Sequence, residues 1–419
     1  MERIMEGRKG FNIKELKQQN RALILRNIAV GNGQSRVDLS RITGLSKMAV
    51  GNLVTDLIQM GMVEECEAQV ESALSGRRPI MLKISRRSPC ICGMLIKRSL
   101  FQVVLADLSG KVIEKKEISF HGNLSREEIP EKLLSAFNEL RMHTTREIVA
   151  VGVSSLGPLD AQRGVILNPP LFYGIENLNI VEIIERETGL PVFLINDANA
   201  GALAEKLYGA KKSVPNFLYL HIMNGIGAGY LLDNKLYSGD SGQSGEIGHT
   251  SISFTGPKCG CGNTGCLELY ASVERMQERI DELMPLYPGS VLSRFPNAKE
   301  IAWTDIVDNA NRKDPLAITV LEEFCGYVAY ALTNTLNLLD ISCVIVGYDS
   351  TVEGNIVEKL LTKKISSAVI YSRYRNVHVV RSHFGGDAPL VGAIACVAEK
   401  VFDLSLPLLM DDAPEKEAR

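Results

Sequence analysis

The sequence predicts an α/β protein with two similar lobes behind a small, basic, winged helix-turn-helix head. Three observations lead to this prediction. The chain of 419 residues is too long for one compact core. Its N-terminal part is basic and carries short helical patterns. Two later segments, residues 92–120 and 217–239, share one rhythm of strand, loop, strand, turn and strand, each followed by helical patterns.

The charge of the chain is unevenly distributed. Residues 1–89 hold 15 Lys and Arg against 9 Asp and Glu, a net charge of +6, which leaves −9 for the remainder of a chain whose total is −3. A basic head on an acidic body favours a head that meets a polyanion such as nucleic acid.

The composition also bears on the compartment. The 9 cysteines are an odd number, and most are scattered without the spacing of a disulfide framework, which is typical of reduced thiols. The N-terminal segment lacks the apolar stretch of a signal peptide, and no apolar run reaches the roughly 18 residues that cross a bilayer. We therefore expect a cytoplasmic protein that does not enter a membrane.

Two short helices joined by the turn Thr-Gly-Leu-Ser form the core of the predicted head. The first helix should be capped by Ser35 and end at Gly44, with Leu39 and Ile42 pointing inward. The second helix should begin after Ser46, a good N-cap. Its apolar stripe consists of Val50, Leu53, Val54, Leu57 and Ile58. This arrangement is typical of a helix-turn-helix whose second helix reads the major groove.

The candidate DNA contacts lie on the second helix and on a wing formed by strands at residues 62–69 and 77–85. Lys47 can reach phosphate or guanine, and Asn52 can pair with adenine. The loop before the second strand could enter a minor groove. The predicted DNA-binding residues are Ser46, Lys47, Met48, Asn52, Arg77 and Arg78. The alternative is a three-helix packing module with a solvated basic loop.

Several motifs of the chain resemble those of the ROK family of sugar kinases and transcriptional repressors. The body contributes LINDANAGALAE at 194–205, GEIGH at 245–249 and CGCGNTGCLE at 259–268, and the head resembles the repressor branch in GLSKMAVGNLV at 44–54 and GRRP at 76–79. The resemblance extends from about residue 20 to about residue 400. It implies an actin/hexokinase-like (ribonuclease H-like) body with a sugar in the cleft between two lobes.

The resemblance also suggests how the chain is divided. We expect a separate DNA-binding head at 1–87, a first lobe at 88–200 that is completed by a C-terminal helix at about 386–410, and a second lobe at 201–385. A protein with such a head should bind operator DNA as a homodimer or homotetramer, because two-fold protein symmetry matches an inverted repeat.

One histidine and three cysteines predict a metal centre. His249, Cys259, Cys261 and Cys266 supply one nitrogen and three sulfurs, a usual closed tetrahedral zinc set. The glycines that would let this loop turn tightly are Gly260, Gly262 and Gly265. Four protein ligands leave no open position, so the zinc would be structural. The alternative is a cluster of free thiols near a hydrogen-bonded histidine.

The resemblance assigns five residues to a sugar. They are Asn196, Asp197, Glu246, His249 and Glu268. In the kinases of the family, the residue that matches Asp197 is the general base that deprotonates the sugar hydroxyl. On local grounds, Asn196 and Asp197 could also simply cap the helix that follows them.

The phosphate-donor side departs from the kinase pattern. The kinases need D-x-G-x-T between the first two strands of the first lobe, where this chain has Leu95, Lys97 and Ser99 in place of the three specified residues. Met223 and Asn224 precede the GIGAG loop where Gly-Thr is usual, and Tyr348 replaces a second glycine.

The sequence therefore predicts a non-enzymatic repressor of carbohydrate uptake or catabolism genes, controlled by a sugar or sugar phosphate. The alternatives are an active sugar kinase with a DNA-binding head, and a regulator controlled by a protein partner.

Overall fold

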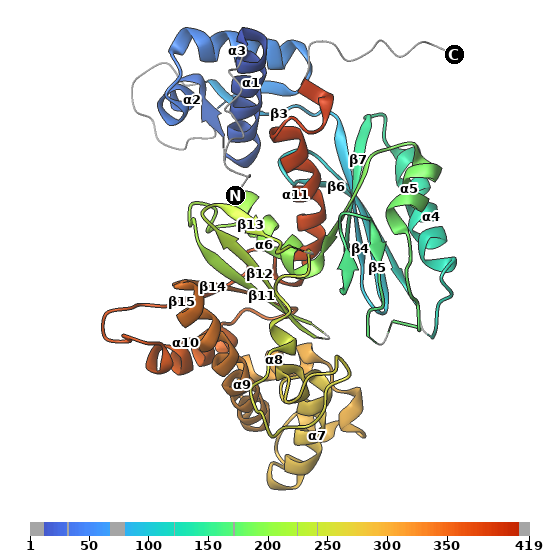
Figure 1. Ribbon diagram of the computed structural model, residues 1–419, viewed down its shortest axis with the longest axis vertical. Coiled ribbons are helices and arrows are strands. Elements are labelled where there is room, and N and C mark those ends of the chain that lie inside the picture. The colour runs from blue at the N-terminus through green and yellow to red at the C-terminus, as the bar shows by residue number, and fades with distance from the viewer. Residues whose placement is uncertain are drawn as a thin grey trace, which may run out of the picture.

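The head lies at one end of the molecule and two lobes form the body (Figure 1). This computed structural model describes residues 12–31, 33–67, 80–120, 122–170, 172–223, 225–240 and 242–409. The predicted two-lobed α/β body behind a winged helix-turn-helix head is confirmed.

The head consists of three helices and a small antiparallel sheet of strand order β1-β3-β2. Its elements are α1 (Ile13–Val30), β1 (Gln34–Ser35), α2 (Arg36–Thr43), α3 (Lys47–Gln59), β2 (Val63–Glu67) and β3 (Ile80–Ile84). Ser35 and Ser46 are the N-caps of α2 and α3, and Gly44 ends α2 in the left-handed conformation, as predicted. The prediction for Ile42 is wrong, because that side chain is 55% exposed. The short helix α2 buries only Leu39, so its contact stripe is narrower than expected.

Each lobe contains a five-stranded mixed sheet built to the same plan. The first sheet has the order β10-β7-β4-β5-β6, and the second has the order β13-β12-β11-β14-β15. In each, an antiparallel three-stranded meander is extended by two parallel strands. The two segments that share a sequence rhythm form these meanders.

The bounds of the body elements follow the chain. The first lobe holds β4 (Cys90–Ile96), β5 (Leu100–Ala106), β6 (Val112–Ser119), α4 (Glu128–His143), β7 (Ile148–Ser155), β8 (Leu159–Asp160), β9 (Val165–Ile166), α5 (Ile180–Thr188) and β10 (Val192–Asn196). The segment after β10 holds α6 (Asp197–Leu207), β11 (Phe217–Ile222), β12 (Ile226–Leu232), β13 (Lys235–Tyr237), α7 (Val273–Leu283), α8 (Trp303–Asn311), α9 (Pro315–Leu339), β14 (Cys343–Gly347), α10 (Ile356–Ala368), β15 (His378–Arg381) and α11 (Ala388–Phe402).

Helix α9 is the one described helix that is long and apolar enough to cross a membrane. Its most apolar 18-residue window has a mean hydropathy of 1.3 and is 61% buried inside the protein. The helix supplies many residues of the second lobe's hydrophobic core, so its apolar character is explained by packing.

Helix α11 connects the head to the body. It packs against α6 and against β4 and β7 of the first sheet, and Figure 1 shows it running from the cleft between the lobes up to the head. This position supports the proposed division, in which the C-terminal helix completes the first lobe. Its apolar residues Ile394, Val401 and Phe402 belong to the same buried cluster as Ile24 and Leu25 of α1.

The head therefore packs directly on α11 of the body, and its bounds at 1–87 stay a prediction. Polar contacts reinforce the shared core: Arg21 Nη1 donates to the carbonyl of Leu409 at 2.8 Å, and Arg26 pairs with Glu399 of α11 at 2.7 Å. Arg21 and Leu409 are both buried, so the end of the described chain forms part of the head's core.

Shortening the Leu409 side chain should destabilise the head, although Leu409 and the head lie far apart in the sequence. Leu409 is fully buried in the shared cluster, and a buried Leu→Ala substitution costs about 2–5 kcal/mol. Leu409→Ala should lower the melting temperature of the head, followed by a probe attached there. The exposed Leu286 offers the control Leu286→Ala. A head that melts at the wild-type temperature in Leu409→Ala would contradict the shared core.

Candidate functional site

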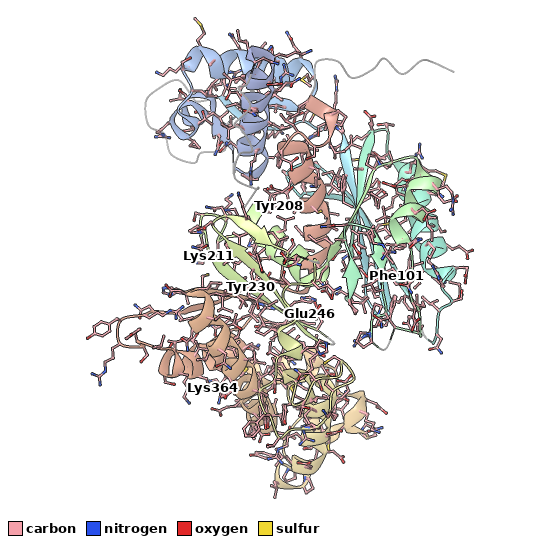
Figure 2. The ribbon with its side chains drawn as sticks, in the orientation of Figure 1. Phe101, Tyr208, Lys211, Tyr230, Glu246 and Lys364 are labelled. Atoms are coloured by element: carbon pink, nitrogen blue, oxygen red, sulfur yellow. The ribbon has the colours of Figure 1, made fainter. Side chains whose placement is uncertain are left out.

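A small cavity of about 130 Å³ lies in the cleft between the two lobes. It is lined from the first lobe by the end of β4 and the loop after β7, and from the second lobe by β11, the loop before β12 and the GEIGH segment. All five residues that the resemblance assigns to a sugar line this one cavity, namely Asn196, Asp197, Glu246, His249 and Glu268. Figure 2 shows Glu246 near the middle of the molecule, between the two lobes.

Asn196 and Asp197 reach the cavity because they join β10 to α6. Asn196 Oδ1 accepts hydrogen bonds from the amides of Ala198 and Asn199, and Asp197 Oδ1 accepts one from Ala198 at 2.8 Å. The capping interpretation is thus confirmed. The capping bonds use only the Oδ1 atoms of the two residues. Asn196 Nδ2 and Asp197 Oδ2 take no part in capping, so capping does not compete with ligand contact.

Asp197, which is partly exposed, and His221, which is buried, face each other in the cavity. His221 Nε2 of β11 lies 3.9 Å from Asp197 Oδ2. Burial raises the pKa of Asp197 to about 7, and the carboxylate of Glu246 adds to the rise, whereas Arg98 and Lys97 oppose it. Burial, reinforced by Lys97, lowers the pKa of His221 to about 3, so its imidazole is neutral.

The sequence reasoning missed His221. It stands in a strand, Phe217–Ile222, whose residues are all buried. A lone histidine in an otherwise apolar strand was the available indication. Its partner on α6 could not be foreseen, because the contact joins two elements whose packing the sequence does not reveal.

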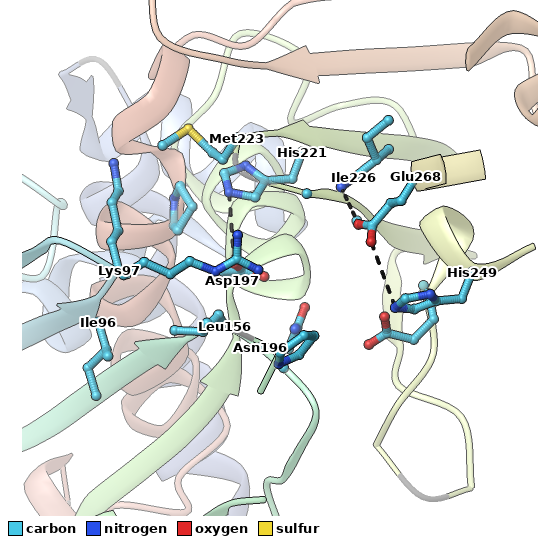
Figure 3. A pocket seen from close by; sticks show the side chains of 18 of the residues that line it. Ile96, Lys97, Leu156, Asn196, Asp197, His221, Met223, Ile226, His249 and Glu268 are labelled. Carbon is cyan, nitrogen blue, oxygen red and sulfur yellow. Dashed lines mark hydrogen bonds and ion pairs between the residues drawn. The ribbon is translucent and has the colours of Figure 1, made fainter. Parts of the chain in front are cut away.

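Glu268 is held by the first residue of β12. Its Oε1 accepts a hydrogen bond from the amide of Ile226 at 2.9 Å, and its Oε2 lies 4.0 Å from His249 Nε2 (Figure 3). Glu246 is exposed into the cavity, and the loop residue Gly157 of the first lobe lies against both Asn196 and Glu246. Acidic oxygens from several segments thus converge where they can accept hydrogen bonds from hydroxyl groups.

The four predicted metal ligands converge beside this acidic group. Their ligand atoms, one nitrogen and three sulfurs, all lie within 4.8 Å of one another. Cys261 Sγ lies 3.7 Å from Cys266 Sγ, and Cys259 Sγ lies 3.8 Å from His249 Nδ1. Bonds of about 2.3 Å from a tetrahedral zinc would place two sulfurs about 3.8 Å apart, so the set can hold one metal ion.

His249 links this metal centre to the cavity. Its Nδ1 faces the sulfur of Cys259, and its Nε2 faces Glu268. A ligand histidine commonly uses its second nitrogen for a hydrogen bond that fixes the ring. A metal ion in the loop would therefore orient a group that lines the cavity.

The loop that carries the cysteines depends on close backbone approach. Gly265 has φ of +67°, and a Cβ atom on it would lie 1.8 Å from the carbonyl oxygen of Ser253, so no other residue fits. Gly262 has φ of +94°. Gly260 has ordinary φ and open space around it, so the turn does not require glycine there.

Four predicted DNA contacts lie together on the surface of the head. Ser46, Lys47, Met48 and Asn52 are all exposed at or near the start of α3. Met48 is 77% exposed although it is apolar, which suits a side chain that meets a partner. Arg77 and Arg78 lie outside the described residues, whereas the two strands that flank them, β2 and β3, pair as predicted.

The residues that depart from the kinase pattern lie partly in the cavity and partly in the core. Lys97 and Arg98 line the cavity, and Lys97 Nζ lies 4.0 Å from Asp349 Oδ2 of the other lobe. Tyr348 is fully buried, and its hydroxyl donates to Glu358 at 2.9 Å. Leu95 is buried in the cluster that continues into the head. Met223 also lines the cavity, and Asn224 lies outside the described residues.

Metal analysis of the purified full chain should find about one tetrahedral ion per chain, with zinc preferred by the His-Cys₃ donor set. Cys261→Ser should lose this ion and lower the melting temperature, because a structural metal contributes folding free energy. Cys66→Ser, at a partly exposed free cysteine outside the set, should keep both. A metal-free wild type with undiminished stability would contradict the metal centre.

Comparisons with known proteins agree with this architecture. Residues 93–400 match the ROK family. The chain is 30% identical to the xylose repressor of Bacillus spizizenii over 392 residues, which are 93% of this chain and 97% of that repressor. The crystal structure of a ROK family transcriptional regulator, a homologue of the E. coli Mlc protein, gives a TM-score of 0.75 at 27% identity and covers 94% of this chain and 98% of that one.

A kinase is also similar in structure. A ROK family glucokinase from Streptomyces griseus, solved in complex with glucose and AMPPNP, gives a TM-score of 0.66 at 26% identity over 74% of this chain and 99% of that chain. The matched family region covers most of the body, and the similar repressor covers the head as well. The chain belongs to the ROK family.

Proposed function

We propose that this protein is a transcriptional repressor of carbohydrate uptake or catabolism genes. A sugar in the interlobe cavity controls its affinity for operator DNA. One observation carries the proposal. A single apolar core joins an exposed helix-turn-helix face to a cavity that is lined by Asn196, Asp197 and Glu246. The similarity to a xylose repressor over nearly the whole chain supports it.

The donor side supports a sensor rather than a kinase. Leu95 is an apolar residue at the position where the kinase pattern has the aspartate that organises magnesium, and its burial leaves no metal ligand there. Tyr348 fills the space that a second glycine would leave open. We therefore propose that the chain does not transfer phosphate.

One observation favours the rival kinase activity. An aspartate with a pKa of about 7 is well suited to act as a general base near neutral pH. The same shift follows from burial alone, so it does not by itself require catalysis. An assay for ADP release with magnesium, ATP and a panel of hexoses and pentoses separates the two functions.

Helix α11 is the physical connection between sugar and DNA. Its second residue, Pro389, lines the cavity, and its far end packs with the head through Phe402 and Glu399. A ligand that draws the lobes together would shift one end of a rigid helix whose other end supports α1. Such a shift would alter the spacing between two heads on an inverted repeat.

The remaining partners follow from this role. We propose a structural zinc at the His-Cys₃ set, double-stranded operator DNA as the target of α3 and the wing, and a homodimer or homotetramer in the cytoplasm. Arg77 and Arg78 remain proposed contacts of the wing. A protein partner that replaces the sugar as the controlling ligand would be indicated if no sugar shifts the melting temperature.

Lys47→Ala should weaken operator binding by removing a phosphate contact. Among the described residues Lys47 has no ion pair, so its ammonium is available to DNA. If it contacts phosphate only, its loss should act equally on all DNA sequences and lower the salt slope by about one. Fluorescence anisotropy against salt measures both effects. Lys299→Ala, an exposed lysine of the second lobe, is the charge-matched control. Equal affinity and salt slope in the two variants would contradict the docking of α3.

Asp197→Asn should separate sugar sensing from DNA binding. The asparagine oxygen can keep the cap on Ala198, but the charged acceptor is lost, so sugar affinity should fall on the order of 10- to 100-fold. Operator affinity without sugar should stay near wild type. The control is Asp160→Asn. Asp160 also accepts a backbone hydrogen bond in a turn, but it lies outside the cavity. Phosphorylation of a sugar by wild type, lost in Asp197→Asn at unchanged sugar affinity, would establish the kinase instead.

A further inference from the structure

His221 is a buried polar side chain to which the proposed function gives no role. It lies in β11, whose 6 residues are all buried, and only 6% of its side chain is exposed. Its Nδ1 has no hydrogen-bond partner among the described residues. His221 nevertheless lines the cavity, and Figure 3 shows its ring pointing at Asp197. An unpaired buried polar group costs about 1–3 kcal/mol, so an imidazole at this place needs an explanation.

The gap between His221 and Asp197 has the width that one shared oxygen atom would fill. Nε2 and Oδ2 are 3.9 Å apart, which is too long for a direct hydrogen bond. An oxygen atom about 2.8 Å from each would bond both at an angle of about 90°, which a hydroxyl group accommodates. Asp197 Oδ1 already accepts from the amide of Ala198, so Oδ2 is the atom left to accept from a ligand.

The two side chains offer complementary chemistry to such a hydroxyl group. Burial, reinforced by Lys97, lowers the pKa of His221 to about 3, so the neutral imidazole has one N–H donor and one acceptor. The carboxylate form of Asp197 favours the tautomer that carries the proton on Nε2, the nitrogen that faces it. A hydroxyl group can then donate to Oδ2 and accept from Nε2–H at the same time.

The neighbours of His221 hold its ring in place. The ring is stacked on that of Tyr219, with centres 6.1 Å apart and planes inclined by 21°. Tyr219 is fully buried. It fits against Gly201 of α6 and Gly347 of β14, where an added Cβ would lie 2.2 Å from its ring and 1.9 Å from its hydroxyl. A ring held in this way presents Nε2 at a fixed place, which reduces the entropy lost when a ligand binds.

We infer that His221 is a ligand-positioning residue of the interlobe cavity, which holds one hydroxyl group of the sugar together with Asp197. This role rests on the proposed function, which places a sugar in the cavity. The resemblance assigns five residues to the sugar, and His221 is not among them. The role concerns binding alone and requires no bond to be made or broken.

Calorimetric titration of the full chain with glucose, xylose, N-acetylglucosamine and each of their monodeoxy derivatives can test this role. For a sugar that binds, one deoxy derivative should bind about 10- to 100-fold more weakly, because it loses the hydrogen bond to the charged Asp197. His221→Leu should weaken the parent sugar about 2- to 10-fold, the range for a neutral hydrogen bond, and should not weaken that derivative further. His221→Gln, whose amide can donate near the place of Nε2, should restore most of the parent's affinity.

A purely structural role of His221 predicts a different pattern. His221→Leu would then weaken the parent sugar and all its deoxy derivatives by the same factor, which would overturn the inference. The control is Ser154→Ala. Ser154 is buried in β7, its Oγ has no partner among the described residues, and it does not line the cavity. This variant should change the affinity for each sugar by no more than about twofold.

The tautomer of His221 gives a second test that uses only the wild-type chain. NMR of the full chain with isotope-labelled histidine should show the His221 proton on Nε2 in the complex with the parent sugar. The signal is assigned through the contact of this ring with Tyr219. A proton on Nδ1 in the complex would overturn the inference, because Nε2 would then have no hydrogen to donate.

The remaining outcomes separate this inference from the proposed function. A sugar that binds and shifts operator affinity, without any hydroxyl group coupled to His221, would overturn the inference and leave the proposed function standing. Binding of none of the three sugars would overturn both.

Discussion

The close packing of α11 on α6 is the constraint on which the rest of the structure depends. A Cβ atom on Gly392 would lie 2.0 Å from the carbonyl oxygen of Ala200, so the two helices are in backbone contact. Helix α6 starts at Asp197 in the cavity, and α11 starts beside Pro389 in the same cavity. Because both helices also reach toward the head, their contact determines where the lobes, the cavity and the head lie relative to one another. Tyr208, just after α6, lies below the head in Figure 2.

The site combines two kinds of rigidity. Backbone hydrogen bonds hold the carboxylates: Glu268 accepts from Ile226, and Asp197 accepts from Ala198. The loop of His249 and the three cysteines has no α-helix or long strand of its own and is held by backbone hydrogen bonds such as those from Ile252 to Gly265 and from Cys259 to Asn263, to which a metal ion would add a cross-link. His249 belongs to both parts, because its Nδ1 faces Cys259 and its Nε2 faces Glu268.

The fold alone does not decide between sensing and catalysis. A glucokinase and a transcriptional regulator of the same family both match the body, and a fold hosts different functions through the residues placed in its sites. Particular positions therefore matter more than the fold. Asp197 would serve either function, whereas Leu95, Lys97 and Tyr348 depart from the kinase pattern, and both Leu95 and Tyr348 are buried.

Local features of the fold could be predicted from short stretches of the chain. Ser46 as a cap, the stripe of α3, the repeated strand rhythm and the His-Cys₃ set depend on short-range periodicity and spacing, and the structure reproduces them. Tertiary packing, in contrast, leaves Ile42 exposed, brings His221 to Asp197 and buries Leu409 in the core of the head. His221 meets Asp197 because β11 packs on α6, and Leu409 meets the head because α11 packs on α1. Apolar surfaces attract without direction and are compatible with many partners, so the local pattern of the chain does not specify which elements pack together.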